Sequence, residues 1–160
     1  MRGILAILAD RREKTYERAH AAKAIADMAA SLGDSRDDAV VVLLEAAEEP
    51  NEVRKWALLA LAELHEPMAL PAFQRAAQDA DWMIRIFAAH GFDRLRAHDS
   101  LGEVVRLLAD EESGVREAAA SALASIGDGR VRPLLERAAA VDPYPWVREA
   151  AKDALAVLRS

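Results

Sequence analysis

The sequence contains no cysteine, few aromatic residues, and only 7 glycines and 6 prolines among its 160 residues. Without cysteine the chain cannot form disulfide bonds or thiolate metal sites. With so few glycines and prolines, the chain has few residues that break a helix. Alanine, the strongest helix former, is abundant. This composition predicts an all-α protein with enough residues for one domain.

The sequence also has no excess of positive charge and no long apolar run. Its net charge is −6 and its isoelectric point is about 5.3, whereas a general nucleic-acid binder needs a basic face. The apolar run near the N-terminus, residues 3–9, is followed by charged residues and is too short for a membrane span or a signal peptide. We therefore expect a cytoplasmic protein with neither nucleic acid nor membrane as its partner.

An apolar residue followed by arginine recurs along the chain at a nearly constant spacing. The four clear copies, 31, 31 and 32 residues apart, are Val53-Arg54, Ile84-Arg85, Val115-Arg116 and Val147-Arg148. Small residues follow each arginine after three and six positions, and larger apolar residues after seven and ten. These offsets share one face of a helix. A period near 31 with one such helix per unit is typical of a solenoid.

Each unit also contains an earlier apolar helix, and helix breakers separate the units. The sequence therefore predicts an α-solenoid of about five helix–turn–helix repeats forming a single domain, 1–160. The expected repeats span approximately 1–34, 35–65, 66–96, 97–128 and 129–160. The first repeat is expected to have about one extra helical turn, because its Gly33 comes four residues later than the matching Gly127 does in the fourth.

An acidic residue stands six positions before the arginine in four of the repeats. The pairs are Glu48/Arg54, Asp79/Arg85, Asp110/Arg116 and Asp142/Arg148. An acid, then Val-Arg, then a helix of small residues resembles a HEAT repeat, and the short period resembles the HEAT-like repeat of phycobilisome lyases. The first repeat departs from the pattern, since Arg12 occupies the acidic position and Glu17 the valine position.

These acids and arginines are expected to form a structural ladder of charge-assisted hydrogen bonds across the stack. In this interpretation Arg85→Ala leaves Asp79 without its partner. The alanine face that follows each arginine lets the helices approach closely, so that stacking buries one continuous core.

The sequence contains no recognisable catalytic or cofactor motif. Without cysteine, and with no plausible serine nucleophile near a histidine by pattern, no catalytic triad can be assembled, and there is no glycine-rich phosphate loop. His65-Glu66 resembles the His-Glu pairs of deoxyhypusine hydroxylase, but a di-iron site would need several such pairs on facing helices. We therefore predict no catalytic residue, no metal and no cofactor.

The second helix of each repeat is expected to line the concave side and to expose the positions one, two and five after its arginine. In the second and third repeats several of these positions are apolar or aromatic, and a contiguous aromatic patch usually marks a binding site. The alternative is that bulky residues fill a tight bend. The predicted partner-binding residues are Lys55, Trp56, Leu59, Trp82, Ile86, Phe87, His90 and Arg94.

The function predicted from the sequence is a non-catalytic scaffold that binds another protein or a peptide segment on this concave face. The resemblance to phycobilisome lyase repeats implies an alternative, a bilin lyase-type subunit or a chromophore-handling chaperone. The DNA glycosylases built from HEAT-like repeats use a basic cleft, and the acidic composition of this chain does not predict such a cleft. The first helix is expected to expose Ile4, Leu5 and Leu8, which would allow self-association through the terminal repeats.

Overall fold

The structure, a computed structural model, describes residues 2–158 as a chain of helices without strands. The α-helices are α1 (Arg2–Ala9), α2 (Thr15–Asp27), α3 (Arg36–Ala46), α4 (Glu52–Glu63), α5 (Leu70–Ala76), α6 (Trp82–Leu95), α7 (Leu101–Leu107), α8 (Ser113–Ile126), α9 (Arg132–Val141) and α10 (Pro145–Val157). Five short 3-10 turns, η1 to η5, lie between some of these helices. None of the helices in this described part reaches the length and apolarity that a membrane span requires.

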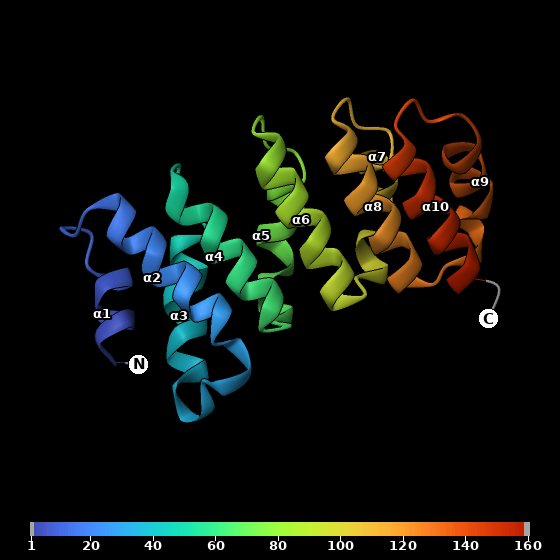
Figure 1. Cartoon of the computed structure of the whole chain (residues 1–160). Helices are drawn as coiled ribbons and strands as arrows, with labels where there is room; N and C mark the ends of the chain where they lie inside the picture. The colour runs from blue at the N-terminus through green and yellow to red at the C-terminus, as the bar shows by residue number, and fades with distance from the viewer. Residues whose placement is uncertain (1, 159–160) are drawn as a thin grey trace.

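The helices form five antiparallel pairs that stack side by side from the N-terminal to the C-terminal end (Figure 1). The second helices, α2, α4, α6, α8 and α10, pack against one another in sequence order and form the second-helix layer. The first helices form the opposite layer, in which only α1 and α3 make substantial contact. The family of folds predicted from the sequence, an all-α solenoid, is confirmed.

Small residues on the second helices allow the two layers to approach closely. Gly91 in α6 shows how close this approach is, because a Cβ atom there would lie 2.4 Å from the ring of Phe73 in α5. Phe73 and Phe92 are fully buried and contact each other edge to face, with ring centroids 6.4 Å apart. The missing side chain of Gly91 therefore makes room for the largest core residue of the third repeat.

The additional residues of the first repeat do not lengthen its second helix. Helix α2 ends at Asp27, and the following residues form the 3-10 turns η1 (Ala29–Ser31) and η2 (Gly33–Ser35). Gly33 adopts a positive φ of 51°, a conformation that costs glycine little. The predicted extra helical turn is thus a separate 3-10 turn, which carries the chain from α2 to α3.

The prediction that the first helix exposes Leu8 is wrong. Leu8 is fully buried, Ile4 and Leu5 are half-buried, and it is Ile7 that lies exposed. Helix α1 packs against both α2 and α3, so the side of the helix that carries Leu8 faces the core.

Candidate partner-binding face

The ladder arginines connect each repeat to the next. In α6, Arg85 donates from Nε and Nη2 to the two carboxylate oxygens of Asp110, both at 2.8 Å. Its Nη1 donates to the carbonyl oxygens of Asp79 and Ala80, in the turn before its own helix. Arg116 repeats this arrangement with Asp142 at 2.7 and 3.0 Å. Each arginine thus fixes its own turn and holds the following repeat.

This pairing corrects the expected partner of Arg85. The carboxylate of Asp79 accepts a hydrogen bond from Arg54 Nη1 at 2.6 Å, while Arg85 bonds only the backbone carbonyl of Asp79. The acid six positions before an arginine lies in the turn, where its carbonyl faces its own repeat and its side chain faces the preceding one. Arg85→Ala therefore strips Asp110, and not Asp79, of its partner.

The first repeat contributes to the ladder although its sequence departs from the pattern. Arg18 is buried, donates from Nε to the carbonyl of Leu8 at 2.8 Å, and binds the carboxylate of Glu49 through both terminal nitrogens. Glu48, the residue six before Arg54, instead pairs with Arg75 on the first-helix layer. The acid of the second repeat is therefore Glu49, one position later than predicted.

The ladder carboxylates are stabilised in their charged form. The hydrogen bond from Arg18 lowers the pKa of Glu49, and that from Arg116 lowers the pKa of Asp142. Burial raises the pKa of the Asp110 carboxyl, but the hydrogen bonds from Arg85 and from a backbone amide outweigh burial and leave the pKa lowered. These acids are consequently ionised and engaged by arginine at neutral pH.

The predicted aromatic residues of the second and third repeats lie together on the second-helix layer. The ring centroids of Trp56 in α4 and Phe87 in α6 are 6.3 Å apart, at an angle of 45° between the rings. Both rings are half-buried, and with Leu59 and Ile86 they pack against the core. Trp82, at the start of α6, is the more open side chain, with 44% of its surface exposed.

A groove of about 220 Å³ opens beside Trp56, between α2 and α4. It combines an aromatic surface with a cation, because Lys23 Nζ lies 5.7 Å from the centroid of the Trp56 ring. The remaining lining residues are Tyr16, Ala19, His20 and Glu52. An apolar side chain could enter this groove and contact the indole.

The polar residues among the predicted partner-binding residues are held by neighbouring carboxylates. Lys55 forms ion pairs with Glu52 at 2.8 Å and Asp81 at 2.9 Å, and the hydrogen bonds that its ammonium group donates to these two acids raise its pKa. The other two, His90 and Arg94, share one acid across the boundary between repeats.

His90 Nε2 and Arg94 Nη2, both on α6, lie 2.8 and 3.1 Å from Oε1 of Glu63 on α4. Burial raises the pKa of Glu63, but the hydrogen bonds from His90 and Arg94 lower it further than burial raises it. Lys55, His90 and Arg94 thus contribute to inter-repeat contacts, which sequence reasoning missed because their carboxylate partners lie outside the repeated motif.

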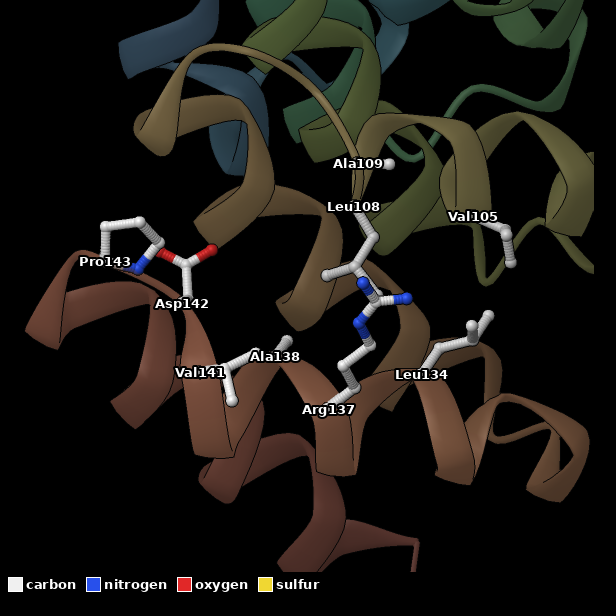
Figure 2. Close-up of a pocket in the computed structure, with 9 residues that line it drawn as sticks. All are labelled: Val105, Leu108, Ala109, Leu134, Arg137, Ala138, Val141, Asp142 and Pro143. Atoms are coloured by element: carbon white, nitrogen blue, oxygen red, sulfur yellow. The ribbon is translucent and has the colours of Figure 1, made fainter.

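Two further grooves were not predicted from the sequence. One lies on the first-helix layer between α7 and α9 and has a volume of about 400 Å³. Figure 2 shows Val105 and Leu134 facing each other across it, with Arg137 extending toward Leu108. Leu134 is 41% exposed, but the sequence pattern predicted exposed apolar residues only on the second helices and on the first helix of the chain.

The other groove, of about 450 Å³, lies on the second-helix layer between α8 and α10. Its lining includes Trp146, which is 46% exposed, together with the acids Glu117, Glu149 and Asp153. The three acids stand one or five positions after a ladder arginine, where exposure is expected, but Trp146 precedes the ladder arginine and therefore fell outside those positions.

The His65-Glu66 pair is used for structure. The side chain of Glu66 is buried, caps η3 (Pro67–Ala69) through the amide of Met68, and pairs with Arg36 at 3.2 Å. His65 is exposed and contacts the carbonyl of Glu63. Within residues 2–158 no three histidine or acidic side chains are grouped as a metal site would require.

Comparison with protein families identifies two matching sequence patterns. The pattern described as HEAT repeats matches residues 70–156, more than half of the chain, and the pattern described as PBS lyase HEAT-like repeat matches residues 53–79. No curated protein sequence matches the chain significantly.

Solved structures with similar folds include natural and designed repeat proteins. A chain in the complex of CpcE and CpcF of phycocyanin lyase from Nostoc sp. PCC7120 superimposes with a TM-score of 0.83 at 22% identity, covering 97% of this chain and 63% of that one. A designed armadillo repeat protein in complex with the peptide (KR)4 gives 0.78 at 20% identity, covering 97% and 80%. Designed armadillo repeat proteins for modular peptide recognition give 0.73 at 21%, covering 96% and 80%. At these identities the similarity establishes the fold.

Proposed function

We propose that this chain, which belongs to the HEAT-repeat family, is a non-catalytic scaffold that binds a segment of another protein on its second-helix layer. The main observation that supports this proposal is the contact between Trp56 and Phe87 across two neighbouring repeats, beside an open groove. Clustered aromatic side chains dominate the binding energy of many protein interfaces.

The second-helix layer suits an extended or helical segment because it repeats the same helix face at each step along the stack. An apolar side chain of the segment would enter the groove between α2 and α4 and contact Trp56, while Trp82 would bound the site toward the turns. Since Lys55, His90 and Arg94 are already paired within the chain, they contribute polar edges to this site without supplying free charge.

The similarity to peptide-binding armadillo designs supports this proposal at the level of architecture. One of those designs was solved with the peptide (KR)4, and others were made for modular peptide recognition. A stack of helix pairs can therefore hold a peptide, and the half-buried aromatic pair supplies this chain with apolar anchors for one.

The test is to select ligands for the wild-type chain from a displayed peptide library and to measure their affinity for Trp56→Ala. We expect an affinity loss of about thirtyfold, corresponding to roughly 2 kcal/mol for truncation of an interface tryptophan. Glu149→Ala, in the last repeat, should bind as the wild type does.

Because Trp56 is half-buried, its truncation also lowers stability, and a second control separates the two effects. Phe73→Leu creates a cavity in the core at a residue that does not line the proposed groove, and it should lower the melting temperature while preserving affinity. If Trp56→Ala behaves like Phe73→Leu, with a lower melting temperature and unchanged binding, Trp56 is a core residue and the proposed site is wrong.

A second candidate function is that of a chromophore-handling subunit of the bilin lyase type. It is favoured by the PBS lyase HEAT-like pattern in residues 53–79 and by the similarity to the CpcE–CpcF complex. Titration of a free bilin into the purified chain, followed by visible absorbance, tests this candidate. A saturable spectral shift would support it, and an unchanged spectrum would contradict it.

A further inference from the structure

The ladder is open at the last repeat. Arg148 donates from Nη1 to the carbonyls of Asp142 and Pro143, as the preceding arginines do to their own turns. In Arg85 and Arg116, Nε and Nη2 bind the carboxylate of the following repeat. No carboxylate within residues 2–158 lies at ion-pair distance from Arg148, so its Nε and Nη2 lack the acid that the preceding arginines bind.

The first repeat presents a matching acid at the other end of the stack. Glu13 stands five residues before Arg18, as Glu49 stands five residues before Arg54. Both glutamates lie in the turn between the two helices of a repeat, and these turns follow one edge of the stack (Figure 1). Glu13 is exposed, and a side-chain hydrogen bond with Glu17, followed by the negative charge of Glu17 and a smaller effect of Asp10, raises its pKa. A cation at this position would relieve the repulsion among these acids.

Two further positions carry opposite charges at the two ends of the stack, and the first of them is in the last repeat. The residue four after the ladder arginine is fully buried in each of the first four repeats, which have a following repeat, as Ala22, Leu58, Ala89 and Ala120. In the last repeat this position is Lys152, whose side chain is 58% exposed.

At the position immediately before the ladder arginine, an acidic residue replaces the usual apolar one in the first repeat. This position holds a buried apolar residue wherever a preceding repeat is present, as Val53, Ile84, Val115 and Val147. In the first repeat it is the half-exposed Glu17. The outer faces of the two terminal repeats therefore depart from the repeat pattern with opposite charges, at positions that face neighbouring repeats elsewhere in the stack.

The N-terminal face also contains room for an apolar contact. A groove of about 590 Å³ lies between α1 and α2, lined by Ile4, Ile7, Ala21 and Ala24, with Glu13 and Glu17 among its other lining residues. Ile7 is 38% exposed there. The groove thus places apolar surface next to the two acids.

We propose that the occupant of this N-terminal face is the last repeat of a second copy of the chain, docked head to tail. In this assembly Arg148 of one copy binds Glu13 of the next, and Lys152 lies beside Glu17, so that the ladder continues across the junction. Because the two surfaces differ, the contact is heterologous, and repeated docking produces linear chains of molecules. This proposal does not depend on the partner site at Trp56.

The first measurement is sedimentation of the purified 160-residue chain over a range of concentrations. We expect the average mass to rise with concentration, and to rise less at about 0.5 M salt than at about 0.05 M, because salt screens exposed ion pairs. A chain that stays monomeric at every concentration and at low salt would overturn the proposal.

The decisive experiment exchanges the charges of the junction. Glu13→Arg and Arg148→Glu should each weaken self-association by about tenfold or more, because each places like charges opposite one another. An equimolar mixture should restore it to within about threefold of the wild type, since every junction between the two variants again pairs an acid with a base. Restoration by mixing cannot result from damage to folding.

A second exchange addresses the case in which Arg148→Glu disturbs the turn that Arg148 stabilises. Lys152 bonds only Glu149 among the described residues, so Lys152→Glu leaves that turn intact. This variant, mixed with Glu17→Lys, should show the same loss alone and the same recovery together. If neither mixture restores association that both variants lost, or if the variants associate as the wild type does, the two faces do not meet as proposed.

Discussion

At the scale of the residue, Arg85 shows how one side chain connects three segments of the chain. It bonds two carbonyls before its own helix and both carboxylate oxygens of Asp110 in the next repeat. The side chains of Arg85 and Asp110 are each only 11% exposed, so solvent screens their attraction little.

We expect Arg85→Ala to lower the free energy of unfolding by about 1–3 kcal/mol, the range for losing hydrogen bonds to a charged group. Urea unfolding followed by circular dichroism measures this change. Arg137→Ala, on the exposed side of α9, should change stability by no more than about 0.5 kcal/mol. An unchanged unfolding curve with lost peptide binding would show that the arginine row is a binding site.

The ladder also predicts how stability depends on pH. Glu49, Asp110 and Asp142 have lowered pKa values in the folded protein, so below about pH 4 the unfolded chain binds protons more readily than the folded one. Their contribution to stability is fully present above their unfolded pKa values and is lost as the pH falls through the folded ones. Unfolding free energies measured between about pH 5 and pH 2.5 should decrease, and less steeply in Asp110→Asn. An equal slope in that variant would contradict the assignment.

The ladder residues could be recognised from the sequence, but their pairing could not. The repeated spacing identifies Arg85 and Asp79 as members of the same motif. Which neighbour the Asp79 carboxylate contacts depends on how far one repeat is displaced against the next, and the sequence of a single repeat does not encode that displacement. For the same reason Glu49, rather than Glu48, binds Arg18.

At the scale of the element, the contact between α5 and α6 depends on the absence of a side chain at Gly91. Gly91→Ala should destabilise the protein by about 1–3 kcal/mol, because the new methyl group would overlap the buried ring of Phe73. Thermal unfolding measures the effect. The double variant with Phe73→Leu should recover part of the loss, since the smaller side chain gives the methyl group room.

Gly102, in α7, provides the matched control because a Cβ atom there meets nothing within 4 Å. Gly102→Ala should leave stability unchanged or raise it by up to about 1 kcal/mol, as alanine favours the helix more than glycine does. Equal losses in both variants would show that the effect at Gly91 comes from backbone conformation and not from packing.

Helix periodicity predicted the second helices well because each carries small and large apolar residues at fixed offsets. It failed for α1, where the choice between burying Ile7 and burying Leu8 depends on the orientation of a short helix against α2 and α3. It also assigned exposed positions to Trp56 and Phe87, which the neighbouring repeat half covers. Contacts between repeats decide these cases.

At the scale of the whole molecule, the terminal repeats have one neighbour each and the middle repeats have two. Stability in such stacks is approximately a sum of contacts between adjacent repeats. We expect amide hydrogen exchange, measured at low protein concentration, to be fastest in α1 and in the outer turns of α10, and slowest in α4 and α6. Faster exchange in the middle repeats would contradict a stack held by contacts between neighbours.

The departure of the first repeat from the sequence motif, with Arg12 in the acidic position, would predict that this repeat lacks a ladder contact and is weaker for that reason as well. The structure contradicts that reason, because Arg18 is buried and bound to Glu49. Faster exchange in α1 therefore follows from its short length and its single neighbouring repeat. We expect the exchange of α2 to resemble that of the inner second helices more closely than α1 does.

The unequal packing of the two layers has a mechanical consequence. The second helices are packed against one another along the whole stack, whereas the backbones of the first helices after α3 make few close approaches to one another. Bending that opens or closes the gaps between first helices breaks few contacts, while stretching the second-helix layer breaks many. The molecule should therefore bend easily where the first helices separate or approach, and resist stretching along the second-helix layer. An occupant of the groove between α7 and α9 would then alter the curvature of the stack.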